Sequence, residues 1–211
     1  MNIALFGATG KTGSIILQKL IEQEAGISVL VRLPSKLGDL PLNIKIIEGS
    51  ILDSDKVYQT IEGCDAVICV VGHVKGTSEN MQRDGIKNII AAMDKLKAKR
   101  LVTLTGSGVF TKGDSASLFD KIMRFMVKTI TPSRFNDGAN MSEIIKQSNL
   151  DWVIVRAPLI TNEKAKDLFQ VFETLLPNKP AFRIGRDDLA EFIIGNLEMD
   201  DYIRKMPVVS Y

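Results

Sequence analysis

Short apolar runs alternate along the chain with segments in which apolar side chains recur every three or four residues. The first pattern is that of a buried strand, and the second is that of a helix with one apolar face. The runs predict strands at Asn2–Phe6, Ile27–Val31, Ile44–Glu48, Ala66–Val71, Leu101–Thr105, Trp152–Val155 and Phe182–Ile184. The periodic segments predict helices at Gly13–Glu24, Ser54–Ile61 with a Ser as its N-cap, Ser78 to about Lys97, Ala139–Gln147 and Asp187–Leu197.

The expected strands are apolar on both faces. In Ala66–Val71, for example, every residue is apolar. Such strands, separated by helices, are typical of a parallel sheet that is covered on both sides. The sequence therefore predicts a doubly wound α/β (Rossmann) fold of three layers, α/β/α, in a single domain over residues 1–211.

Two segments, residues 111–136 and 161–180, do not fit this alternation. Both follow expected strands at the carboxyl edge of the sheet, where ligands bind in such folds. We interpret them as small insertions on the substrate side. The first is either a lid or an amphipathic helix that packs its Met and Phe side chains into the core. The side chains in question are Phe119, Met123, Phe125, Met126 and Phe135.

Composition and charge narrow the class of protein. The formal net charge is +2, and no basic run is interleaved with aromatic residues, which argues against a nucleic-acid partner. One histidine and two cysteines, Cys64 and Cys69, are too few for a structural zinc site, so no metal is expected. Neither a signal sequence nor a membrane-spanning run is visible, and we expect a cytoplasmic protein without a membrane partner.

The clearest motif is a glycine-rich loop, Gly-Ala-Thr-Gly-Lys-Thr-Gly at residues 7–13, between the first strand and the first helix. Gly7 would permit the turn out of the strand, Gly10 the close approach of a diphosphate, and Gly13 tight packing of the helix. Amide groups at a helix start, together with the helix dipole, favour an anion there. The residues expected to hold the diphosphate are Gly7, Thr9, Gly10, Lys11, Thr12 and Gly13.

The residues after the second strand predict which dinucleotide is bound. In an NAD site a carboxylate in this region binds the ribose 2′-hydroxyl. Here Arg32 stands at that place, Lys36 follows, and the first acidic residue is Asp39. A guanidinium can hold a 2′-phosphate and stack on adenine, so NADP(H) is expected in preference to NAD(H). The alternative is that Arg32 is a solvated charge at a strand end.

An ordered series of motifs runs from the glycine loop almost to the end of the chain. The motifs are Gly7–Gly13, Val29–Arg32, Asp65–Ile68, Ile89–Met93, Ser148–Trp152, Arg156–Pro158 and Ile184–Ala190. Together they resemble the atypical short-chain dehydrogenase/reductases of the NAD(P)H-binding, NmrA-like group, and within that group the flavin reductase (biliverdin reductase B) family. The resemblance is specific for fold and cofactor and only weakly specific for substrate.

The resemblance implies further cofactor contacts. Ser50 and Ile51 would lie by the adenine, although relatives usually have Asp at the position of Ser50. Val71 and Gly72 would pass near the adenosine ribose. The residues implied beside the nicotinamide are Thr105, Pro158, Leu159 and Ile160.

The usual catalytic pair of short-chain dehydrogenases, a Tyr with a Lys four residues later, is missing. Glu62 and Met206 follow Tyr58 and Tyr202 at that spacing, and Tyr211 is the last residue given. The candidate catalytic groups that remain are the hydroxyls of Thr105 and Ser107, which could bind a substrate carbonyl or flavin edge, or could instead satisfy the local backbone.

Three other polar residues have alternative interpretations. His73 could donate a proton, but a lone histidine in a loop is more often a polar surface residue, and we favour that reading. Arg156 could hold an anionic substrate or form a structural ion pair. Asp137 is too generic to assign.

Two functional hypotheses follow. The first is an NADPH-dependent reductase that transfers hydride to a flavin, quinone or similar planar acceptor, a reaction that needs placement more than acid–base groups. The second is a non-catalytic NADP(H) sensor of the NmrA-like type. A nucleotide-sugar epimerase is disfavoured because the acid–base pair is missing. Beyond a small-molecule acceptor, the expected assembly is a monomer or homodimer.

Overall fold

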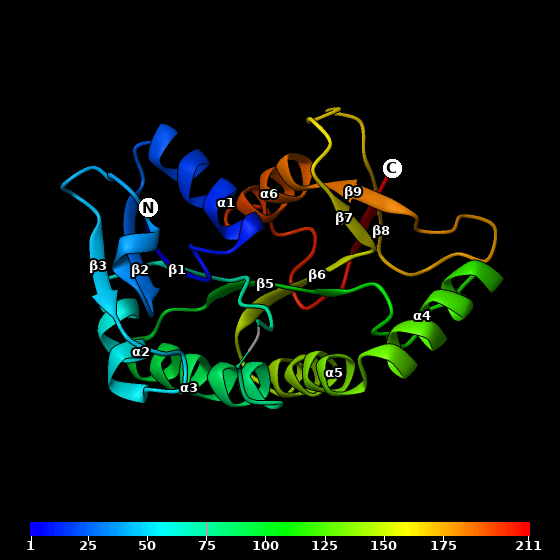
Figure 1. The fold of residues 1–211 in the computed structure, drawn as a ribbon, viewed down its shortest axis with the longest axis horizontal. Coiled ribbons are helices and arrows are strands. Elements are labelled where there is room, and N and C mark those ends of the chain that lie inside the picture. The colour runs from blue at the N-terminus through cyan, green and yellow to red at the C-terminus, as the bar shows by residue number, and fades with distance from the viewer. Residues whose placement is uncertain (75) are drawn as a thin grey trace.

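The computed structural model describes residues 1–74 and 76–211, which form a central sheet covered by helices on both faces (Figure 1). The sheet has eight strands in the order β3-β2-β1-β4-β5-β6-β10-β8. They are β1 (Asn2–Phe6), β2 (Gly26–Val31), β3 (Lys45–Glu48), β4 (Ala66–Cys69), β5 (Arg100–Gly106), β6 (Asp151–Ala157), β8 (Gln170–Phe172) and β10 (Val208–Ser210). The pairings are parallel except that of β8 with β10. A separate parallel pair joins β7 (Leu159–Thr161) to β9 (Arg183–Gly185).

The helices form the two outer layers. On one face lie α1 (Lys11–Glu22) and α6 (Arg186–Gly195), and on the other lie α2 (Ser54–Ile61), α3 (Met81–Leu96) and α5 (Pro132–Lys146) (Figure 1). Beyond α5 in the figure comes α4 (Leu118–Ile130). A short 3₁₀ helix, η1 (Pro34–Lys36), follows β2. The predicted doubly wound, three-layer α/β fold is thereby confirmed.

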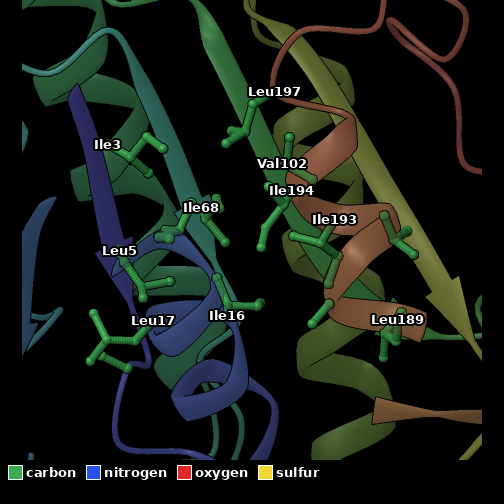
Figure 2. Packing of buried hydrophobic residues seen from close by; sticks show 14 of the residues in the cluster. Ile3, Leu5, Ile16, Leu17, Ile68, Val102, Leu189, Ile193, Ile194 and Leu197 are labelled. Atoms are coloured by element: carbon green, nitrogen blue, oxygen red, sulfur yellow. The ribbon is translucent and has the colours of Figure 1, made fainter. Parts of the chain in front are cut away.

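The alternation of side chains along β1 explains why the sheet needs helices on both faces. Ile3 and Leu5 belong to the core cluster under α1 and α6, whereas Ala4 and Phe6 belong to the cluster under α2, α3 and α5. Figure 2 shows the first of these clusters, in which Leu5 lies near Ile16 and Leu17 of α1. A strand whose neighbouring residues point to opposite faces can be apolar throughout only if both faces are buried.

Several element boundaries differ from the prediction. The helix at 54–61 is capped by Asp53 rather than by a serine, because the Asp53 carboxylate accepts hydrogen bonds from the amides of Asp55 and Lys56. The helix predicted at Ala139–Gln147 begins at Pro132, a residue that suits the first helical position because it lacks an N–H. The strand predicted at Ala66–Val71 ends at Cys69.

The segment 111–136 contains α4, which does not pack its apolar residues into the core. The one buried residue of α4 is Asp120. Its Phe and Met side chains are partly or largely exposed; Phe125, for example, is 71% exposed. The alternative that α4 packs these side chains into the core was therefore wrong.

A buried ion pair ties the segment 111–136 to the sheet. Arg156 on β6 is fully buried, and its Nη1 lies 2.6 Å from Oδ2 of Asp114, whose side chain is 2% exposed. The Arg156 Nε also donates to the Met206 carbonyl oxygen at 2.7 Å. Arg156 is thus a structural residue, and its guanidinium is not available to bind a substrate.

The carboxylate of Asp114 is stabilised in its charged form. Burial would raise the pKa of Asp114, but hydrogen bonds from Arg156 and from the backbone amides of Leu175 and Thr111 outweigh burial and hold that pKa below its usual value. Hydrogen bonds to the charged form of a carboxyl group favour ionisation. Asp114 therefore joins β6, the 111–136 segment and Leu175 through interactions that require its charge.

The helices of the described part of the chain are short or polar. None of them is both long enough and apolar enough to cross a lipid bilayer.

Candidate functional site: a dinucleotide crevice and an apolar cavity

The glycine loop lies at the carboxyl edge of the sheet, where the strand order reverses between β1 and β4. The chain leaves β1 at Gly7, whose φ is +97°, a conformation that favours glycine. A Cβ on Gly13 would lie 2.0 Å from the carbonyl oxygen of Gly7, so the first turn of α1 packs directly on the loop. Ligands of open α/β sheets bind at such a reversal point.

The N-terminus of α1 is suited to an anion. Gly10 is its N-cap and provides no side-chain hydrogen bond, and the first turn carries no acidic residue. The predicted residues Thr9, Gly10 and Lys11 are all exposed there. Since the first N–H groups of a helix have no partner within it, these amides can bind a diphosphate. The cradle of glycine backbone thus fits the dinucleotide that the fold implies.

The two basic residues expected to bind the adenosine part of the dinucleotide lie after the neighbouring strand. Arg32 directly follows β2, which pairs in parallel with β1, and Lys36 ends η1. Both are exposed, and within residues 1–74 and 76–211 neither forms an ion pair. They share the carboxyl edge with the glycine loop, as the prediction requires.

The residues implied beside adenine and ribose follow the next two strands. Ser50 is half-buried after β3, and its hydroxyl accepts a hydrogen bond from the Leu52 amide at 3.2 Å. Ile51 is buried against Gly85 of α3. Val71 and Gly72 follow β4. The sheet therefore brings all four to the same edge as the glycine loop.

A cavity of about 460 Å³ opens farther along this edge, at the ends of β5 and β6. The residues assigned to the nicotinamide side or to catalysis all line it, namely Thr105, Ser107, Pro158, Leu159 and Ile160. The apolar side chains that α4 contributes to the lining include Phe119, Met123 and Val127. The glycine loop does not line this cavity. It follows β1, which is separated in the sheet from β5 by the single strand β4.

Two hydroxyls in the cavity have no partner in the part of the chain that the structure describes. Thr105 is 8% exposed, and neither its hydroxyl nor that of Ser107 makes a hydrogen bond with another described residue. Gly138 of α5 lies so close that a Cβ there would be 3.2 Å from the Thr105 Oγ1. The hydroxyls therefore do not satisfy the local backbone, and they are available to a ligand.

His73 is not the polar surface residue that was expected. Its side chain is 8% exposed, and its Nε2 lies 2.8 Å from Oδ2 of Asp137, which is fully buried. The same carboxylate accepts hydrogen bonds from the amides of Gln82 and Arg83 at the start of α3. Asp137 thus caps α3 from a different helix, and this network fixes the loop after β4.

The three tyrosines lie away from the cavity. Tyr58 is on α2, Tyr202 packs edge-on against Phe192, and the Tyr211 hydroxyl bonds to Asp188. Burial, followed by the hydrogen bond to Asp188, raises the pKa of Tyr211 to about 12. No tyrosine is therefore positioned for proton transfer in the cavity.

Sequence reasoning missed several residues of the cavity. Gln82, Arg134 and Gly138 line it. The sequence pattern placed Gln82 within an expected helix, Arg134 within the segment 111–136, and Gly138 in no element, and it gave none of the three a role in the site.

Strand order, glycine cradle and cavity together define a Rossmann-type, dinucleotide-binding protein. The profile of a family described as NAD(P)H-binding matches residues 7–200, and the chain belongs to that family. Its relatives include a protein named oxidoreductase GME11367, from Pestalotiopsis microspora, which is 32% identical over 166 residues. That alignment covers 71% of this chain and 62% of the relative, so the chain spans about three fifths of that protein.

Solved structures with low sequence identity share the fold. An anaerobilin reductase, ChuY of Escherichia coli O157:H7, superposes with a TM-score of 0.80 at 15% identity, covering 100% of this chain and 97% of ChuY. A short-chain dehydrogenase/reductase of Veillonella parvula, solved in complex with NADP, has a TM-score of 0.77 at 16% identity, covering 100% of this chain and 94% of that one.

Proposed function

We propose that this protein is an NADPH-dependent reductase of a planar, conjugated acceptor such as a flavin or a quinone. The observation that carries the proposal is the apolar cavity beside Thr105 and Pro158, at the same edge of the sheet as the glycine cradle. The names of the relatives, an oxidoreductase and a reductase among them, support redox chemistry. The resemblance to the flavin reductase family supports the type of acceptor.

The chain's residues would act by placement. Pro158, Leu159 and Ile160 would border the nicotinamide, and the side chains of α4 would hold the acceptor against it and exclude water. The hydroxyls of Thr105 and Ser107 would bind a carbonyl or ring nitrogen of the acceptor. The bound cofactor supplies a hydride, and with one proton from solvent the acceptor gains two electrons while NADPH becomes NADP⁺.

A panel of acceptors tests this proposal. We expect NADPH oxidation to depend on added FMN, riboflavin, biliverdin or a quinone. Thr105→Val should lower the turnover number about tenfold, because one hydrogen bond to the acceptor is lost at similar volume. Absence of acceptor-dependent oxidation across the panel would exclude the reductase.

The cofactor preference is a second part of the proposal, and it rests on Arg32. Arg32→Glu should weaken NADPH binding about tenfold or more, because it places a carboxylate beside the 2′-phosphate, and should affect NADH far less. Calorimetric titration with both dinucleotides measures the difference. Lys121→Glu, the same kind of charge change on exposed α4, is the control. Equal losses for NADPH and NADH would contradict the assignment.

The alternative function is a non-catalytic NADP(H) sensor, which the lack of a tyrosine in the cavity favours. It predicts dinucleotide binding without turnover and a partner protein whose binding depends on the dinucleotide. Acceptor-dependent NADPH oxidation would decide against it.

A further inference from the structure

The cavity is lined by three charged side chains, and two of them already have protein partners. Asp120 shares a capping box with Ser117 at the start of α4 and accepts a hydrogen bond from the Ala181 amide at 3.2 Å. Arg124 donates to the Gly108 carbonyl oxygen, and its guanidinium lies 4.3 Å from the ring centre of Phe110. Both charges are held in place by the protein itself.

Arg134 is the third, and its guanidinium has no partner within residues 1–74 and 76–211. It is an exposed residue of the first turn of α5, and it makes neither an ion pair nor a side-chain hydrogen bond with any described residue. The first turn of α5 contains no acidic residue. Within the described residues, the guanidinium of Arg134 is thus not paired with a carboxylate, and it lies at a cavity whose other lining is largely apolar.

The rest of the cavity offers surfaces suited to a ring system. Phe119, Met123 and Val127 come from α4, and Phe119 also packs on Phe182 with ring centres 4.8 Å apart. The hydroxyl of Thr105, a residue more than nine-tenths buried, is without a partner in the described structure. Apolar walls with a few convergent polar groups are typical of a small-molecule site.

We infer that the acceptor carries an acid group, a carboxylate or a phosphate, which pairs with Arg134 while its conjugated ring lies among the apolar side chains. This inference rests on the proposed reductase function and deepens it, because it names the class of acceptor. A guanidinium binds either acid group through paired hydrogen bonds, so the two share one recognition chemistry. Neutral acceptors would use the same cavity without that contact.

The experiment compares acceptors that differ only in the acid group. FMN and riboflavin have the same ring and differ by a phosphate, and a naphthoquinone with and without a carboxyl substituent gives the matching carboxylate pair. Dissociation constants are measured with the NADP⁺-loaded protein, so that no turnover is needed, and KM and kcat are measured separately with NADPH. The variants are Arg134→Gln, Arg134→Lys and, as the control, Lys121→Gln on the exposed face of α4.

We expect the unmodified protein to bind at least one acidic member about tenfold more tightly than its neutral partner. Arg134→Gln should remove that difference without changing the affinity for the neutral member, Arg134→Lys should restore part of it, and Lys121→Gln should leave it unchanged. The pair that responds identifies phosphate, carboxylate or both as the acid group.

Two outcomes would overturn the inference. One is equal affinity for acidic and neutral members in both pairs, and the other is a preference that survives in Arg134→Gln. Neither outcome removes the proposed reductase, which stands if riboflavin or the neutral quinone is reduced by NADPH. Binding that depends on Arg134 without any turnover would instead contradict the reductase and leave an anion-binding cavity.

Discussion

Asp114→Asn should lower the free energy of unfolding by about 3–5 kcal/mol, as expected when one partner of a buried ion pair is removed. The fully buried guanidinium of Arg156 would lose its counter-charge. The Leu175 amide would also lose the charged oxygen, Asp114 Oδ1, to which it donates a hydrogen bond. Urea unfolding followed by circular dichroism measures the change.

The ion pair between Lys205 and Glu173 provides the control. Both side chains are largely solvent-accessible, so Glu173→Gln should cost less than about 1 kcal/mol. Similar losses for Glu173→Gln and Asp114→Asn would show that burial of the Arg156 pair has no special energetic role.

The Asp114 pair should also make stability depend on pH. Because the pKa of Asp114 is lower in the folded protein than its usual value, its contribution is complete above the unfolded pKa of about 4 and is lost as the pH falls through the folded pKa. The unmodified protein should therefore lose stability more steeply below about pH 4 than Asp114→Asn. Parallel stability curves for the two proteins in acid would contradict this prediction.

Gly13→Ala should lower the affinity for NADPH by about a hundredfold or more, which corresponds to about 2.7 kcal/mol. The added Cβ would lie 2.0 Å from the Gly7 carbonyl oxygen, and backbone atoms must move to relieve that contact. Movement there separates the α1 amides from the loop that cradles the diphosphate. Overpacking of this kind should also cost about 1–3 kcal/mol of stability.

Gly195→Ala is the matched control. A Cβ at Gly195, the last residue of α6, would meet only the flexible end of Met199, at 3.4 Å. This variant should bind NADPH like the unmodified protein, because it does not touch the crevice. If Gly13→Ala also binds NADPH normally, the diphosphate does not lie on the α1 amides.

The layered fold could be predicted from sequence because local patterns determine it. The apolar run Ile3–Phe6 in β1 requires cover on both faces, and the periodicity within α1 and α6 shows which side of each helix supplies it. The strands β8 and β10 were not predicted. Each has three residues, too few to show a period, and their pairing joins segments that are distant in sequence.

The glycine-loop crevice and the cavity also differ in how far the sequence alone predicts them. The glycine loop is a continuous motif whose geometry follows from the lack of side chains at Gly7 and Gly13. The cavity is assembled from β5, β6, α4 and α5, so Arg134 and Thr105 come together only in the folded chain. For the segment that contains α4, the sequence left two interpretations open, a lid or an amphipathic helix packed on the core, because spacing alone does not show what an apolar face contacts.

A crystal structure of the chain with NADP⁺ tests the central claim most directly. The account predicts the diphosphate on the amides of residues 9–13, the 2′-phosphate at Arg32, and the nicotinamide between Thr105 and Pro158, facing the cavity. A dinucleotide bound elsewhere, or none at saturating concentration, would contradict it.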